Sequence, residues 1–162
     1  MQWRAIIGFE LSWLALCYFK FAALLPVALY GVYALWRLNR RQGVAVVAIF
    51  GCGLVIDTLL SWVNVISFVD ALWLPLWFVM VWLIFAIAAV EFMGAVLNRP
   101  WLAALLGGVG GPISYIGGAG LSNGAMQFPL STLSYAILVV VWAVLAVILG
   151  WSRRFYVVET AR

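Results

Sequence analysis

Four uninterrupted apolar runs constrain this sequence more than any other feature. A helix needs about 20 residues to cross a hydrocarbon core of about 30 Å, and each run reaches that length. The runs extend over residues 44–69, 71–97, 101–120 and 130–152. The first two contain one charged residue each, Asp57 and Glu91, and the other two contain none. These runs therefore predict transmembrane helices.

Composition agrees with a membrane protein. Hydrophobic residues make up 68% of the 162 residues and charged residues only 9%, whereas about a quarter of a soluble protein is charged. The sequence has no histidine, which excludes His-ligated haem, His-rich di-iron chemistry and Ser–His or Cys–His catalytic pairs. We expect a single integral membrane domain over residues 1–162, without a cofactor, a metal or bound nucleic acid.

The N-terminal stretch, residues 3–36, is too long for one crossing, because a straight helix of that length would measure about 50 Å. Glu10, Lys20 and Pro26 also interrupt it. A helical hairpin that turns near residues 18–22 resolves both difficulties. It places Lys20 on one side of the membrane and every arginine on the other, as the positive-inside rule favours. With five spans, Lys20 would lie in the middle of the membrane, which is costly.

We therefore predict an all-α polytopic bundle of six spans in the bacterial inner membrane, the first two forming a short hairpin, with both termini in the cytoplasm. The predicted spans are residues 5–18, 21–36, 44–66, 73–97, 101–120 and 130–151. Asp70 marks a short turn on the outer side, and residues 121–129 form the one longer outer loop. The arginines on the inner side are Arg4, Arg37, Arg40, Arg41, Arg99, Arg153, Arg154 and Arg162.

The fifth predicted span contains a glycine-rich segment, residues 107–120. Gly107 and Gly111 are four residues apart, and small residues at that spacing let helices approach closely. Pro112 removes a backbone donor, so we expect the helix to kink or open there. The segment is either a packing seam in the bundle or a broken helix that lines a cavity.

Asp57 is the deepest acidic residue of the predicted bundle. Counted from the inner end of each span, Asp57 and Tyr115 both lie about 21 Å deep, and Ser114 lies beside Tyr115. A carboxyl group buried at that depth needs polar partners, which these hydroxyl groups and the backbone near Pro112 supply. Asp57 is therefore either a functional residue or structural glue between helices.

Glu10 and Glu91 form a second pair at matching depth, each about 9 Å from the inner edge. Two adjacent carboxyl groups can share a proton or hold a cation. The alternative is that they are unrelated acids that pair with Arg4 or Arg99.

Three segments carry a resemblance to a known family. They are DTLL at residues 57–60, LPLWF at 74–78 (followed by Trp82 and Phe85) and LGGVGGPISY at 106–115. In this order they resemble the bacterial domain-of-unknown-function 2878 family over nearly the whole chain. The sequence departs from that pattern around Glu91, where small or neutral polar residues are expected. The matching positions are Asp57, Pro75, Trp77, Gly111, Pro112, Ser114 and Tyr115.

The resemblance implies a small inner-membrane protein of Gram-negative bacteria with no established activity, in a family whose genes often neighbour those of lipid-modifying enzymes. We expect an accessory protein or scaffold that handles membrane lipids, with lipids, a lipid-modifying enzyme or a second copy of itself as partners. The alternatives are a small transporter or channel with its site at Asp57, Tyr115 and the Pro112 break, and a lipid-modifying enzyme that uses Asp57 or Glu91.

Overall fold

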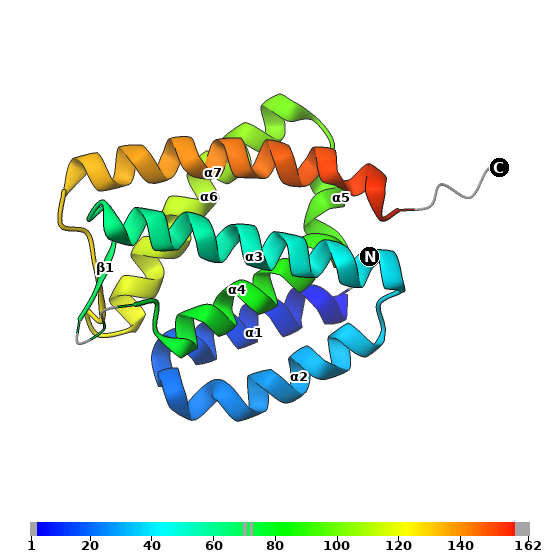
Figure 1. Ribbon diagram of the computed structural model, residues 1–162, viewed down its shortest axis with the longest axis horizontal. Helices are drawn as coiled ribbons and strands as arrows, with labels where there is room; N and C mark the ends of the chain where they lie inside the picture. Colours follow the sequence, from blue (N-terminus) through cyan, green and yellow to red (C-terminus); the bar gives the residue numbers. More distant parts are fainter. Residues whose placement is uncertain (1–2, 70, 72, 158–162) are drawn as a thin grey trace.

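The computed structural model describes residues 3–69, 71 and 73–157, and helices account for most of them (Figure 1). The α-helices are α1 (Trp3–Phe19), α2 (Leu24–Trp36), α3 (Arg40–Trp62), α4 (Leu76–Ala88), α5 (Gly94–Val96), α6 (Pro100–Leu121) and α7 (Thr132–Ser152). The shorter elements are the 3-10 helices η1 (Lys20–Ala23) and η3 (Arg153–Phe155), the π-helix η2 (Ala89–Met93) and the strands β1 (Ser67–Phe68) and β2 (Met126–Gln127). The prediction of a helical bundle is confirmed. Asp70 and Arg162, two residues used to predict the topology, lie outside the described residues.

Five helical stretches of the described chain are long and apolar enough to cross a membrane: Trp3–Trp36, Arg40–Trp62, Leu76–Val96, Pro100–Leu121 and Thr132–Phe155. Large apolar side chains on these stretches face outward, such as Leu25 at 71% exposed and Val47 at 70%. A surface of this kind is stable in lipid and not in water. Exposed tryptophans lie at helix ends, where an aromatic belt forms, and include Trp36, Trp62, Trp101 and Trp151. The protein is therefore a membrane protein.

The first of these stretches turns back on itself. Lys20 has a positive φ of 49° and begins η1, so the chain reverses within the residues where the sequence predicts a turn. α1 and α2 then run antiparallel (Figure 1). Gly8 leaves room for the ring of Tyr30, and the Arg4 guanidinium lies 5.6 Å from the centre of the Tyr33 ring. Both contacts hold α1 against α2.

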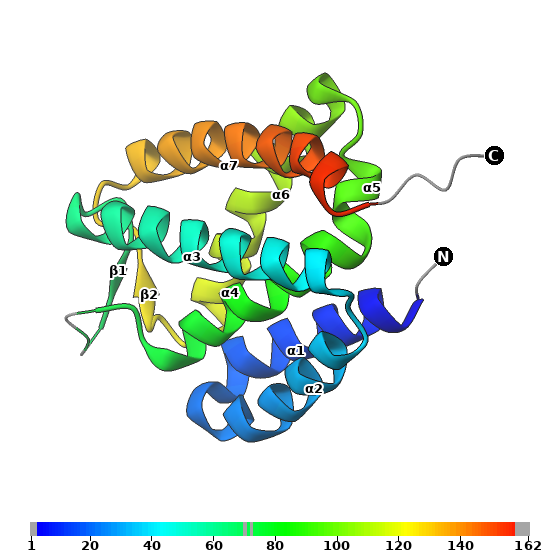
Figure 2. The ribbon, with the colours of Figure 1, turned by 45° about the vertical axis from the view of Figure 1, so that its right-hand side comes forward.

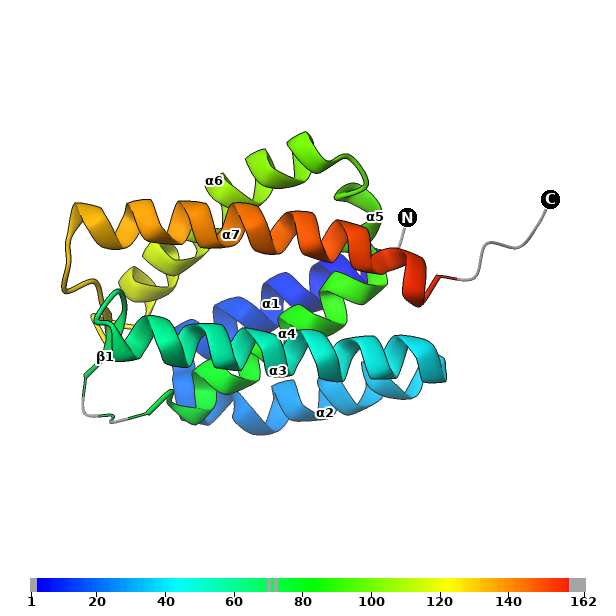
Figure 3. The ribbon, with the colours of Figure 1, turned by 45° about the horizontal axis from the view of Figure 1, so that its top comes forward.

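Successive long helices run in opposite directions. The start of α1 and the last turn of α7 therefore lie on the same side of the bundle (Figures 1 and 3). α4 is central, because it packs against α1, α2 and α3. α6 and α7 pack closely together as a second hairpin on the other side. At the opposite end from the start of α1, the α3–α4 and α6–α7 connections meet.

β1 and β2 join these two connections as a short antiparallel ladder (Figure 2). Ser67 pairs with Gln127 and Phe68 with Met126, and the Val69 amide donates to the Ala125 carbonyl at 2.9 Å. The sequence predicts connecting segments here but not their pairing, which fixes the end of the α6–α7 hairpin to the rest of the bundle.

α6 is continuous through Pro112, so of the two predicted outcomes, a kink or an opening, the opening is wrong. Pro112 cannot donate to the Gly108 carbonyl, but close packing on α7 holds the remainder of the helix together. Gly107 and Gly111 lie so near Trp142 and Ala146 that a Cβ atom at either glycine would collide with them. The glycine-rich segment therefore contains a packing seam.

Candidate functional site

Three side chains from three helices form a buried polar centre: Asp57 of α3, Trp82 of α4 and Tyr115 of α6. Asp57 is only 1% exposed. Its Oδ2 accepts hydrogen bonds from Trp82 Nε1 at 2.6 Å and from the Tyr115 hydroxyl at 2.5 Å. The predicted contact between Asp57 and Tyr115 is therefore confirmed. Trp82 was not predicted as a partner, because the prediction compared only the depths of Asp57 and of residues with hydroxyl groups. An indole N–H inside an apolar run needs an acceptor, and that is the signal that could have found it.

Glycines one helical turn away make room for the aromatic side chains of the site. Gly53 precedes Asp57 by four residues, and the Trp82 ring lies where its Cβ atom would be. Gly111 precedes Tyr115 by four residues, and the Trp142 ring takes the same position there. The two indole rings stack at 5.7 Å with an interplanar angle of 10°. The stacking adds α7 to the three helices that meet at the polar centre.

Asp57 uses only one of its two oxygens. Oδ1 is buried without a hydrogen-bond partner among the described residues. Ser114, predicted to supply one, instead donates to the Gly110 carbonyl of its own helix at 3.2 Å, so that prediction is wrong. A buried acceptor without a partner is costly, and such atoms are uncommon in folded proteins. Within the described part of the chain, Oδ1 is therefore an unsatisfied acceptor inside the bundle.

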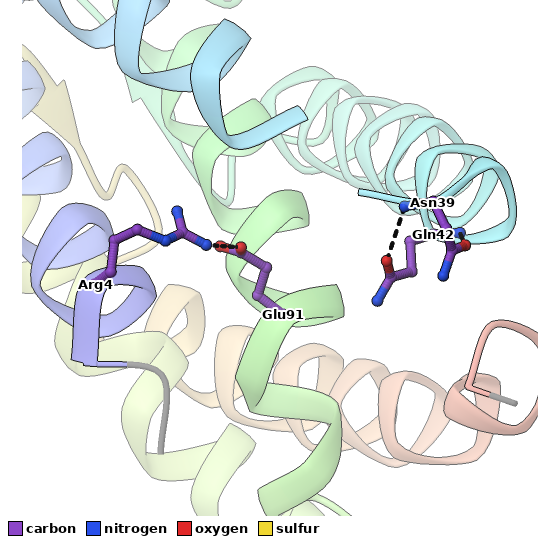
Figure 4. Close-up of polar contacts among 4 residues, drawn as sticks. All are labelled: Arg4, Asn39, Gln42 and Glu91. Atoms are coloured by element: carbon purple, nitrogen blue, oxygen red, sulfur yellow. Dashed lines mark hydrogen bonds and ion pairs between the residues drawn. The ribbon is translucent and has the colours of Figure 1, made fainter. Parts of the chain in front are cut away.

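Glu10 and Glu91 do not form the predicted carboxyl pair. Glu91 lies in η2, and Arg4 Nη2 of α1 donates to its Oε1 (Figure 4). The Glu91 side chain is 4% exposed, whereas Glu10 is exposed on α1. The alternative of an ion pair with Arg4 is therefore correct for Glu91. Figure 4 also shows the reciprocal hydrogen bonds by which Asn39 and Gln42 cap the start of α3.

An apolar cavity of about 330 Å³ lies beside the polar centre, between α1, the α4–α5 segment, α6 and α7. Trp82 and Tyr115 form part of its wall, so Asp57 lies behind them. Small residues of α6 form another part, among them Gly110 and Ser114. Most of the remaining wall is apolar, including Phe9, Trp13, Phe85, Val96, Ala146 and Leu149.

This combination of an apolar wall and a few polar groups is typical of small-molecule sites, which range from about 300 to 1,000 Å³. The volume of the cavity is at the lower end of that range, so it suits one hydrocarbon chain better than a whole lipid molecule. No group of three or more His, Cys, Asp or Glu residues that could hold a metal ion occurs in the described part of the chain. The geometry therefore favours binding of an apolar molecule.

One family model, described as "Protein of unknown function (DUF2878)", matches residues 2–148. The matched range includes the whole polar centre and every residue that lines the cavity except Leu149. No curated protein and no solved structure gives a significant match.

Proposed function

Because this chain belongs to the protein family of unknown function DUF2878 over residues 2–148, we propose a function that involves the whole bundle. In this proposal the bundle holds the hydrocarbon chain of a membrane lipid. The protein would act as an accessory in lipid handling in the bacterial inner membrane, presenting that chain to a lipid-modifying enzyme. The observation that supports this proposal is the apolar cavity of about 330 Å³ between α1, the α4–α5 segment, α6 and α7.

The surroundings of the cavity favour a lipid chain over other apolar molecules. The helices that enclose it carry outward-facing apolar side chains, so lipid is the surrounding solvent and is always in excess. The cavity extends along α6 from Leu106 to Gly118, which corresponds to about 18 Å of helix. An apolar space that follows one helix over this length suits an extended hydrocarbon chain.

The proposal includes six crossings, with both ends of the chain in the cytoplasm. The antiparallel packing of α1 and α2 supports it, as does the position of Arg40, Arg99 and Arg153 at the end of the bundle where α1 begins. A hairpin of two short spans is accommodated when the bilayer thins locally.

Substitution of Gly110 tests the proposal. Its position faces the cavity, and a Cβ atom there meets no other atom within 4 Å, so Gly110→Phe places a ring in the cavity without a backbone clash. We expect the purified full-length wild type to bind one dioleoylglycerol per chain in native mass spectrometry, and Gly110→Phe to bind it at least about tenfold more weakly.

Gly120→Phe is the matched control. Gly120 is on the same helix and also has open space around its Cβ position, but it does not line the cavity. This variant should bind dioleoylglycerol as the wild type does. Equal binding by Gly110→Phe and the wild type, with both folded by circular dichroism, would overturn the proposal.

A small transporter or channel is the second candidate, and the free Oδ1 of Asp57 favours it. A buried acidic group without a full set of partners is a feature of intramembrane transport sites. Under this alternative, vesicles that contain the protein pass a solute or protons, and Asp57→Asn abolishes the flux while the folded yield is unchanged. An equal loss of flux and folded yield would identify Asp57 as structural glue instead.

A further inference from the structure

A second hollow, of about 490 Å³, lies at the end of the bundle where α7 finishes. In contrast to the apolar cavity, its wall contains two arginines and an asparagine, and none of the described residues that line it is acidic. We call it the basic pocket. Its lining residues are Asn98, Gly150, Trp151, Arg153, Arg154 and Val157.

The basic pocket adjoins the apolar cavity. Leu97 and Leu149 line the apolar cavity, and the residues that follow them, Asn98 and Gly150, line the basic pocket. Gly150 lies directly against the Leu97 carbonyl, so α5 and α7 touch where the two hollows meet. A molecule with an apolar chain in the first hollow would therefore have its polar end near the second.

The arginines of the basic pocket are held in ways that suit an anion. The Arg154 guanidinium lies 3.6 Å from the centre of the Trp151 ring and 5.0 Å from that of Phe155. Stacking of this kind fixes the planar group and leaves its edge N–H donors available. Arg153 is partly buried, and its side chain passes close to Gly94 of α5. Arginine binds phosphate oxygens through paired hydrogen bonds.

Resting on the proposed function, we infer that the basic pocket binds the phosphate of the lipid whose chain occupies the apolar cavity. The ligand class is therefore a phosphate-bearing amphiphile, oriented with its phosphate at the end of the bundle where α1 begins. The same chemistry is offered by a glycerophospholipid and by an isoprenyl phosphate. In either case the phosphate lies at the arginine-rich interface and the chain points toward the polar centre.

The test compares lipids that differ only in the phosphate, using the full-length protein in native mass spectrometry. The first pair is dioleoylphosphatidic acid against dioleoylglycerol, and the second is farnesyl phosphate against farnesol. We expect the phosphate to strengthen binding by about tenfold or more in at least one pair, and that pair identifies the lipid source. R153Q/R154Q should remove this advantage and leave the binding of dioleoylglycerol or farnesol unchanged.

R40Q/R41Q is the matched control, because it removes two arginines at the same end of the bundle that do not line the basic pocket. It should retain the advantage of the phosphate. An equal loss in both double variants, or no advantage of phosphate in the wild type, would overturn the inference. Gly110→Phe distinguishes the two proposals: if it weakens no lipid the proposed function fails, whereas failure of the arginine variants alone overturns only the phosphate site.

Discussion

Asp57 connects three helices through a single oxygen atom, because Trp82 and Tyr115 donate to the same Oδ2. Interhelical hydrogen bonds in membranes contribute on average about 0.6 kcal/mol and at most about 2 kcal/mol. The larger energetic effect arises when a donor is left buried without a partner. Removal of the acceptor and removal of one donor should therefore differ in their effects on stability.

We expect Tyr115→Phe to lower the free energy of unfolding by about 1 kcal/mol, since the ring contacts remain and one hydrogen bond is lost. Asp57→Ala should cost about 2–4 kcal/mol, because it leaves two buried donors without an acceptor. The double variant should cost less than the sum, as measured by unfolding in mixed detergent micelles.

Tyr135→Phe serves as the control for this cycle. Tyr135 is 37% exposed on α7, and its hydroxyl group makes none of the side-chain hydrogen bonds found in the described residues. Its removal should leave stability unchanged. Strict additivity of Asp57→Ala and Tyr115→Phe would contradict the shared hydrogen bond.

Gly53 and Gly51 offer a second comparison within one helix. A Cβ atom at residue 53 would enter the Trp82 ring, whereas one at residue 51 meets nothing within 4 Å. Gly53→Ala should therefore destabilise the protein by about 1–3 kcal/mol through overpacking. Gly51→Ala should be neutral or stabilise it by up to about 1 kcal/mol, because alanine favours the helix. Equal thermal unfolding temperatures for the two variants would contradict close packing at Gly53.

At the scale of elements, the ion pair between Arg4 and Glu91 fastens α1 to the π-helix η2. π-Helical turns often mark functional positions, and this one interrupts the helix that leads from α4 to α5. Glu91 is buried, whereas the Arg4 side chain is 31% exposed. Loss of the arginine therefore leaves a charge in an apolar environment, but loss of the acid does not.

We expect Arg4→Met to lower the free energy of unfolding by about 2 kcal/mol, below the usual range for a fully buried pair because Arg4 is partly exposed. Glu91→Gln should cost about 1 kcal/mol, since the amide oxygen still accepts from Arg4. Adding Glu91→Gln to Arg4→Met should restore part of the loss in a thermal unfolding assay. Arg40→Met is the control, and a cost equal to that of Arg4→Met would exclude a specific pair.

The elements themselves were largely predictable from the sequence. The length of each apolar run determines that it forms a helix, and the position of Lys20 indicates the turn between α1 and α2. Depth counting also placed Asp57 level with Tyr115. It gives height along a helix, however, and not the direction in which a side chain points around it.

Because depth counting does not give the direction of a side chain around its helix, the predictions for Ser114 and Glu10 were wrong. Ser114 is adjacent to Tyr115 in sequence, so it is rotated by about 100° around α6, and its hydroxyl group donates to the Gly110 carbonyl and not to Asp57. Glu10 shares its depth with Glu91 but lies on an exposed face of α1. The pairing of β1 with β2 and the π-helix η2 depend on contacts between distant segments, which no local pattern of residues encodes.

At the scale of the whole molecule, the position of Lys20 determines the number of crossings. In a variant that lacks the native thiols (Cys17→Ala and Cys52→Ala), we expect Lys20→Cys to react with a membrane-impermeant maleimide added outside spheroplasts. Six crossings place this turn outside, whereas a single crossing by residues 3–36 would bury it in the bilayer.

Two further positions calibrate the labelling experiment. Asn123→Cys in the α6–α7 connection should react from outside, and Arg40→Cys at the start of α3 should react only after permeabilisation. Protection of Lys20→Cys under both conditions would contradict six crossings. Labelling of Arg40→Cys from outside would reverse the proposed orientation.

The β1–β2 ladder limits how far the α6–α7 hairpin can move. It tethers one end of the α6–α7 hairpin to the α3–α4 connection through Ser67, Phe68 and their partners. The other end of the hairpin is held as well, because Gly150 of α7 lies against the Leu97 carbonyl and α5 packs on α7. The α6–α7 hairpin is therefore anchored to the rest of the bundle at both of its ends.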